Sequence, residues 1–593
     1  MWMRPINIKT KKLLKVGLNG SAGVTYSQGR YPKTSETFNF NYREGKVNWF
    51  ANLGHNYQKR FSNLYLYRNI REQANDEISR IFSQETNRVV EMNGYNAKVG
   101  VDFFASKKTT IGATFNVMDR DGSQRNPSRT EIAGADKVLQ SITNARVENK
   151  MDWTGINGNL NFRRILDKNG SEITADLDGA SFRSATDQLL ENVYFDANGN
   201  AAAKPDTLVG DLPQDINVYS GRVDYYKPLG KKGKFEAGIK SSIVNTDNNA
   251  RYDSVLNGMQ VPDLNRSNHF LYKENINAAY INLERPIGKR FSAQLGLRLE
   301  NTNATGRQKS TGENFDRHYT QLFPTAYVQY EADAKNKLNI NYGRRIRRPA
   351  YGNLNPFIRF LDRYTYSRGN PNLKPSISDN IEVSHTWKNM ITTTLNYTFT
   401  NDVVQEIIRQ NGNEASNIPE NVATYRQFGI SVAANMPVRK WWTNNTNVNL
   451  FNDSYTGNVP GADIDLQATS FFLNTTQQFK LTKTFMAELT GFYRGGSLEG
   501  VLRIKPYWQV GAGLSKQVWN KKGMIRLSVR DIFWTQKMKA RSRYGNVDIT
   551  MDQVAETRVV SLGFTYSFSK GKKMAPVKRS AGSMGEEQGR VGQ

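Results

Sequence analysis

The chain contains 593 residues, of which 38% are hydrophobic and 11% aromatic, and its formal net charge is +27 at pH 7. It has no cysteine, which excludes disulfides, thiolate metal sites and cysteine nucleophiles. No run of about 18 apolar, uncharged residues occurs, which excludes a transmembrane helix. The 28 Tyr, 29 Phe and 47 Gly are more than a disordered chain usually holds, so the composition indicates a folded protein that is polar over much of its interior.

The positive charge does not indicate a nucleic-acid-binding protein. Lysine is concentrated in short turns such as "ASKKTT" (105–110) and "WNKKGM" (519–524), whereas arginine is scattered. The chain contains no zinc finger, no aromatic RNA-binding signature and no basic helix. We therefore expect no nucleic acid among its partners.

Short segments in which apolar and polar residues alternate recur along the whole chain. In chain order, clear examples are 16–26, 47–54, 235–240, 291–299 and 561–568. In "FSAQLGLRL" (291–299) every odd position is apolar, and every even position is Ser, Gln, Gly or Arg. A period of two residues predicts β-strands, and helical periodicity is hard to find.

The connections between these strands alternate in length. About ten tight turns are expected, and about eleven mostly longer polar stretches separate the resulting hairpins, among them 58–92, 119–152 and 347–377. The expected turns lie near 43–46, 105–109, 165–170, 227–233, 285–290, 331–337, 387–390, 436–441, 480–484 and 517–523. Together they predict about 22 antiparallel strands.

This combination predicts a membrane barrel. Lipid favours an apolar outer face, a wet lumen accepts polar side chains, and backbone groups in hydrocarbon must all be paired, so the sheet has to close. The alternatives are a soluble sandwich, a propeller or a β-helix. A propeller would repeat a blade signature every 40 to 50 residues or so, and no such repeat is found. We expect an all-β, closed antiparallel transmembrane β-barrel with long extracellular loops and short periplasmic turns.

Several motifs resemble those of TonB-dependent receptor barrels. The stretch Tyr342–Ser384 carries "RRI" leading to Pro349, "LNPF" at 354–357 and "GNPNLKP" at 369–375. The segment 272–302 and the final stretches "LSVRDIFWT" and "RVVSLGFTYSF" are also similar to this family. The resemblance implies a receptor in a Gram-negative-type outer membrane that imports a scarce solute, whether a siderophore, a cofactor, a glycan or a peptide.

The resemblance also predicts the domain organisation. "INIKTKK" (6–12) resembles the end of the family's N-terminal plug, which implies that the rest of the plug and the signal peptide are missing. We expect a residual plug end at 1–12, the barrel at 13–568 and a disordered polar tail at 569–593. The TonB complex is expected as a partner only if the missing N-terminal region is present.

Candidate ligand residues lie in and beside the long loop near 347–377. The arginine cluster before Pro349 is suited to an anionic ligand, although anchoring to lipid phosphates or loop carboxylates is the more favoured interpretation. "GNPNLKP" is rich in turn formers and is expected to fold over the barrel rim more than to contact ligand. The candidates are Arg344, Arg345, Arg347, Arg348, Tyr351, Asn355, Tyr366 and Asn370.

No catalytic or cofactor site is predicted. The four histidines are dispersed, and "DANGN" (196–200) lacks the distal Glu of a calcium loop. An outer-membrane hydrolase is therefore disfavoured. The main alternative is a plug-less barrel that acts as a weakly selective pore or a surface scaffold, unless loop 347–377 folds inward and closes it. Expected partners are outer-membrane lipid and lipopolysaccharide, the barrel assembly machinery and an unknown solute, and a monomer is expected.

Overall fold

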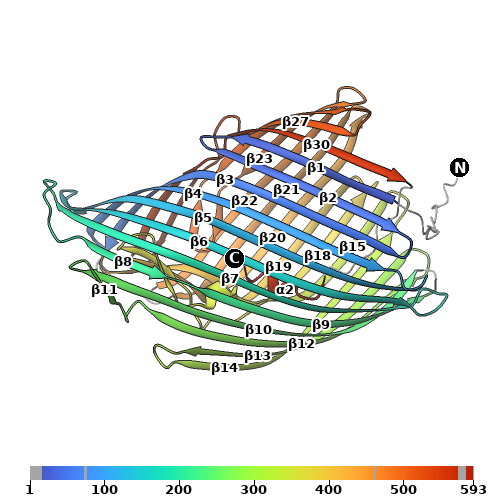
Figure 1. Cartoon of the computed structure of the whole chain (residues 1–593), viewed down its shortest axis with the longest axis horizontal. Helices are drawn as coiled ribbons and strands as arrows, with labels where there is room; N and C mark the ends of the chain where they lie inside the picture. Colours follow the sequence, from blue (N-terminus) through green and yellow to red (C-terminus); the bar gives the residue numbers. More distant parts are fainter. Residues whose placement is uncertain (1–16, 73–75, 231, 460–461, 572–581, 592–593) are drawn as a thin grey trace.

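The computed structural model describes residues 17–72, 76–230, 232–459, 462–571 and 582–591. They form a closed barrel of 22 antiparallel strands (Figure 1), as the alternating pattern predicted. The barrel closes where β1 pairs with β30 from Gly17↔Gly571 to Gln28↔Val560. Closure pairs the first strand with the last, so the sheet has no edge strand in the hydrocarbon. Within the described ranges, no helix is both long enough and apolar enough to cross a bilayer.

The barrel strands follow one another around the wall in chain order. They are β1 (Gly17–Gln28), β2 (Pro32–Glu44), β3 (Val47–Arg71), β4 (Ile78–Phe103), β5 (Thr109–Gly134), β6 (Leu139–Ile165), β7 (Glu172–Asp196), β9 (Gln214–Leu229), β10 (Gly233–Leu256), β12 (Asn268–Ile287), β13 (Phe291–Gln308), β14 (Asn314–Glu331), β15 (Asn336–Arg347), β18 (Ser376–Trp387), β19 (Ile391–Asn411), β20 (Glu414–Arg439), β21 (Trp442–Val459), β22 (Ala462–Lys480), β23 (Phe485–Arg494), β26 (Tyr507–Val518), β27 (Gly523–Arg530) and β30 (Val559–Gly571).

Shorter elements lie within the connections at the end of the barrel opposite the tight turns, except for α2, which follows the last strand. The short strands are β8 (Asp206–Asp211), β11 (Met259–Pro262), β16 (Ile358–Phe360), β17 (Thr365–Arg368), β24 (Ser497–Glu499), β25 (Leu502–Ile504), β28 (Lys537–Tyr544) and β29 (Val547–Ala555). The helix α1 spans Tyr351–Leu354, and α2 spans Gly585–Gln588.

Every predicted tight turn joins two consecutive barrel strands, but the predicted loops at 58–92 and 119–152 are mostly strand. β3 and β4 have 25 and 26 residues and pair almost to their tips. Such strands are longer than a bilayer requires, since about 9–11 tilted residues span it. Beyond the bilayer the outer face of this hairpin meets water and the buried inner face includes polar residues such as Gln84 and Thr86, so the hydrophobic alternation is lost while the hydrogen-bond ladder continues.

The alternating segments face as predicted. On β13, Leu295 is 63% exposed and Leu297 and Leu299 also point outward. Gln294 and Arg298 line a lumenal cavity together with Glu236 of β10. The outer face is therefore apolar and the inner face polar on this strand.

The hydrophobic core lies inside the lumen. Wall residues from β7, β9, β10 and β12 pack against Tyr351, Leu354 and Leu373 of the loop between β15 and β18, and against Met584 near the C-terminus. The expected disordered tail thus differs from the structure in two parts. Residues 569–571 continue β30. Residues 582–591 fold into the lumen, where their charged side chains form ion pairs with wall residues of opposite charge. The motif "INIKTKK" at 6–12 lies outside the described residues.

Candidate functional site in the barrel lumen

The loop between β15 and β18, residues 348–375, folds into the lumen and not over the rim. Its short helix α1 and its β16–β17 hairpin pack against the inner wall. Tyr351 and Leu354 are 3% exposed, and the Tyr252 hydroxyl of β10 donates a hydrogen bond of 2.7 Å to the Ile358 carbonyl. Phe360 lies edge-on to the same Tyr252 ring. The loop is therefore held by both apolar and polar contacts.

The "GNPNLKP" motif fastens the loop to itself. The Gly369 N–H donates to the Asn355 carbonyl at 3.1 Å, and the Asn370 N–H donates to the Asn353 carbonyl at 2.6 Å. A Cβ on Gly369 would lie 2.1 Å from the Asn355 oxygen, so only glycine permits this approach. The Asn370 side chain also donates to the Pro419 carbonyl at 3.1 Å, which ties the loop to β20.

A cavity of about 680 Å³ lies between this loop and the inner wall. The loop contributes Phe357, Arg359, Phe360 and Tyr366 to it. The wall contributes side chains from strands that are distant in sequence, and the charged members of the whole lining are Arg68, Arg88, Arg359 and Glu406. The cavity therefore combines aromatic surface with an excess of positive charge.

The three arginines differ in their access to an anion, since Arg359 is exposed and Arg68 is fully buried. Among the described residues, no carboxylate lies within 4.0 Å of Arg68, Arg88 or Arg359. Arg68 is fully buried, its guanidinium lies 4.6 Å from the ring centroid of Phe82, and its Nε and Nη2 have no hydrogen-bond partner. Arg359 keeps contact with lumenal water, but the protein around it lowers the pKa of its guanidinium through desolvation. Guanidinium groups without partners favour carboxylate or phosphate ligands.

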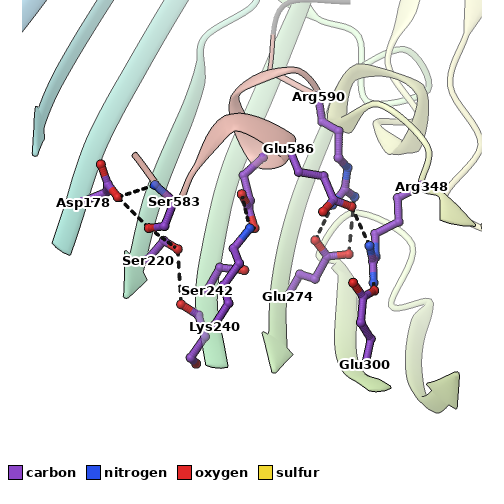
Figure 2. Close-up of polar contacts among 12 residues, drawn as sticks. Asp178, Ser220, Lys240, Ser242, Glu274, Glu300, Arg348, Ser583, Glu586 and Arg590 are labelled. Atoms are coloured by element: carbon purple, nitrogen blue, oxygen red, sulfur yellow. Dashed lines mark hydrogen bonds and ion pairs between the residues drawn. The ribbon is translucent and has the colours of Figure 1, made fainter. Parts of the chain in front are cut away.

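A second polar cluster lies on the other side of the loop (Figure 2). Arg348 is 6% exposed and donates to Glu300 of β13 and to Glu586 of the C-terminal segment, each at 2.7 Å. Arg590 donates to both carboxylate oxygens of Glu274 on β12. In this cluster every charge is paired, in contrast to the cavity.

A family model described as the outer membrane protein beta-barrel family matches residues 164–566, which is more than half of the chain. The chain belongs to this outer-membrane β-barrel family. The barrel lies in a Gram-negative-type outer membrane, so the tight-turn end is periplasmic and the long-loop end is extracellular. A search of curated proteins gave no match.

Solved structures with the same fold include uptake receptors for ferric chelates and a copper transporter. The ferric yersiniabactin uptake receptor FyuA from Yersinia pestis aligns with 14% identity, a TM-score of 0.60 and coverage of 94% of this chain and 81% of that one. The copper transporter OprC aligns with 12% identity, a TM-score of 0.61 and coverage of 94% and 82%. The ferric-catecholate import receptor Fiu from E. coli K12 aligns with 12% identity, a TM-score of 0.59 and coverage of 94% and 82%. At these identities the similarity shows the fold.

The structure places the candidate residues of this outer-membrane barrel in five different surroundings. Asn355 and Tyr366 line the extracellular-side cavity. Arg344 and Arg345 border a different lumenal space of about 550 Å³ beside Glu586, and Arg347 is exposed. Arg348 and Tyr351 contact the C-terminal segment, and Asn370 fastens the loop.

The sequence patterns did not reveal Arg68, Arg88 or Arg359 as site residues. Arg359 lies between two apolar residues in "FIRF", which is the only local signal. Arg68 and Arg88 come from β3 and β4, almost 300 residues earlier in the chain. Only closure of the barrel and the inward fold of the loop bring the three together. Among the described residues, no group of three or more His, Asp or Glu could hold a metal ion.

Proposed function

We propose that this chain is the barrel of an outer-membrane receptor that takes up a scarce anionic solute. The observation that carries the proposal is the charge of the cavity lining. It holds three arginines that form no ion pair with a described carboxylate, and its one carboxylate is Glu406. Its volume of about 680 Å³ falls in the usual range of ligand sites. Solved relatives in fold include siderophore receptors, which supports uptake as the function.

The lining favours one class of solute over the others considered. Guanidinium groups favour carboxylate, catecholate or phosphate oxygens, and the rings of Phe357, Phe360 and Tyr366 favour flat apolar groups. A chelate with several anionic oxygens around a metal fits both requirements. A neutral glycan would leave the arginines without partners, which disfavours that class.

The test compares two arginines of the same loop. Arg359 lines the cavity, whereas Arg363 is paired with Asp206 at 2.6 Å. Binding of a ferric catecholate chelate, ferric citrate and a neutral maltooligosaccharide to the purified barrel would be measured by isothermal titration calorimetry. We expect Arg359→Gln to weaken binding of the best anionic chelate by about tenfold or more, since a hydrogen bond to a charged group contributes roughly 1.5–3 kcal/mol. Arg363→Gln should leave it unchanged.

Two results would contradict the proposal. One is tighter binding of the neutral oligosaccharide than of either chelate. The other is an equal effect of the two substitutions. The alternative function, a weakly selective pore, is less favoured because loop 348–375 and residues 582–591 occupy the lumen. Energy supply by a TonB complex belongs to the proposal and requires a TonB-contacting segment.

A further inference from the structure

The C-terminal segment 582–591 lies inside the barrel. β30 ends at Gly571, which is paired with the first residue of β1 at the periplasmic end. The described segment beyond it reaches the lumen, where Glu587 is fully buried and Ser583 and Arg590 are 5% and 6% exposed. Figure 2 shows its side chains pointing toward strands β7, β9, β10 and β12. One face of a polar, charged segment is therefore buried against the wall, while Glu586 stays 40% exposed.

Each of the three charges on the segment meets an opposite charge. Glu587 accepts from Lys240 at 2.8 and 3.0 Å, and Glu586 accepts from Arg348 at 2.7 Å. Arg590 contacts both carboxylate oxygens of Glu274. Buried charges are costly unless they are paired, so a segment of different charge order would fit this place less well.

The start of the segment is fixed by small and apolar residues. The Ser583 N–H donates to Asp178 at 2.7 Å, and its hydroxyl lies 2.8 Å from the Ser220 hydroxyl. Gly582 has φ +82°, and a Cβ there would lie 2.9 Å from the Asp178 carboxylate. Met584 is 3% exposed within the lumenal core. Shape as well as charge therefore matches the wall.

The segment also supports the extracellular loop. The Arg590 Nε donates to the Pro349 carbonyl at 2.9 Å, and the Tyr351 N–H donates to the Arg590 carbonyl at 3.1 Å. The Arg590 guanidinium lies 4.1 Å from the centroid of the Tyr351 ring. The same loop carries Arg359 into the arginine-lined cavity. Loop 348–375 thus contacts the C-terminal segment 582–591 and also lines the arginine-lined cavity.

We propose that residues 582–591 form a lumenal stopper, a peptide of this chain that binds a dedicated site on the inner wall and closes the barrel. The site recognises a Glu-Glu-x-x-Arg peptide through Lys240 and Glu274 of the wall and Arg348 of the loop. While the stopper is bound, it holds loop 348–375 in its inward position. Its withdrawal opens the lumen and frees the loop, whatever solute the cavity accepts.

Because the chain has no cysteine, a disulfide tests the stopper directly. The variant Ser220→Cys/Ser583→Cys joins two hydroxyl positions 2.8 Å apart. The matched control Ser27→Cys/Ser561→Cys joins two others, also 2.8 Å apart, between the paired wall strands β1 and β30. Each full-length variant would be folded in lipid, checked for heat-modifiable mobility, oxidised, and recorded as single channels in planar bilayers in KCl, before and after dithiothreitol.

We expect both pairs to cross-link without denaturant. Oxidation of the stopper pair should remove channel openings, and dithiothreitol should restore them, whereas the control pair should conduct equally in both states. Deletion of 582–593 should leave a folded barrel, since β30 ends at Gly571, and should raise the open probability several-fold. A stopper pair that fails to cross-link while the control pair does, or a deletion that leaves conductance unchanged, would overturn the proposal.

A charge exchange keeps the proposal testable if the cysteine pair does not fold. Glu587→Lys places two ammonium groups together at Lys240 and should open the channel as the deletion does. Adding Lys240→Glu to Glu587→Lys restores an opposite pair and should close it again. Failure of the second change to restore closure would contradict a specific site for the segment.

Discussion

The outward face of β13 permits a quantitative test of the barrel's orientation in lipid. Its outward apolar positions run from Phe291 to Leu299, with Leu295 at the centre. At about 3.4 Å per residue and a tilt of about 40°, this run rises roughly 20 Å, close to the height of the apolar band of such barrels. Leu295 therefore lies near the middle of the bilayer.

Leu295→Arg should destabilise the barrel by roughly 2–4 kcal/mol, the cost of an arginine at the bilayer midplane. This corresponds to about a 30- to 1,000-fold change in the folding equilibrium. Gln294→Arg, one residue away, should change stability by no more than about 0.5 kcal/mol, because it faces the wet lumen opposite Glu284.

Urea unfolding in phospholipid vesicles, followed by tryptophan fluorescence and by heat-modifiable gel mobility, measures both differences. Equal destabilisation by the two arginines would refute the assignment of lipid and lumen faces on β13. A neutral effect of Leu295→Arg would show that this position lies outside the hydrocarbon band.

Three further predictions concern the loop, the cavity and a buried turn. Gly369→Ala should release loop 348–375 and speed its cleavage by trypsin, because the added Cβ collides with the Asn355 carbonyl. The control Gly343→Ala should not change the cleavage rate, because its Cβ would lie 3.9 Å from the nearest atom. Arg68→Met should lower the urea midpoint, because it removes the buried positive charge that acts on the buried carboxylate of Asp362, and it should also weaken binding of the anionic chelate; an unchanged or higher midpoint would contradict this. Asp531→Ala should lower the free energy of unfolding by roughly 1–3 kcal/mol, because the fully buried carboxylate accepts from the N–H groups of Thr535 and Gln536; an unchanged urea midpoint would count against it.

Local physics made much of the barrel predictable from sequence. In 291–299 the alternation reports two different solvents on the two faces of one strand, and it holds without reference to any distant residue. The tight turns were recognisable because their residues favour sharp reversal wherever they occur. The extent of β3 and β4 was not recognisable, because the buried inner face of their outer halves carries polar residues such as Arg68, Gln84 and Thr86, which hides the alternation.

The contents of the lumen depended on tertiary structure. Arg68 and Arg359 are almost 300 residues apart, and each by itself is an ordinary exposed-looking arginine in the sequence. The C-terminal tail is polar enough to predict disorder, and its composition is as compatible with bulk water as with the lumen. What decides its place is the lumen, where Lys240 and Glu274 of the wall and Arg348 of the loop present charges in an order that only the closed barrel creates. Sequence determined which solvent each strand face meets, and the shape of the enclosed space determined which charged groups meet inside it.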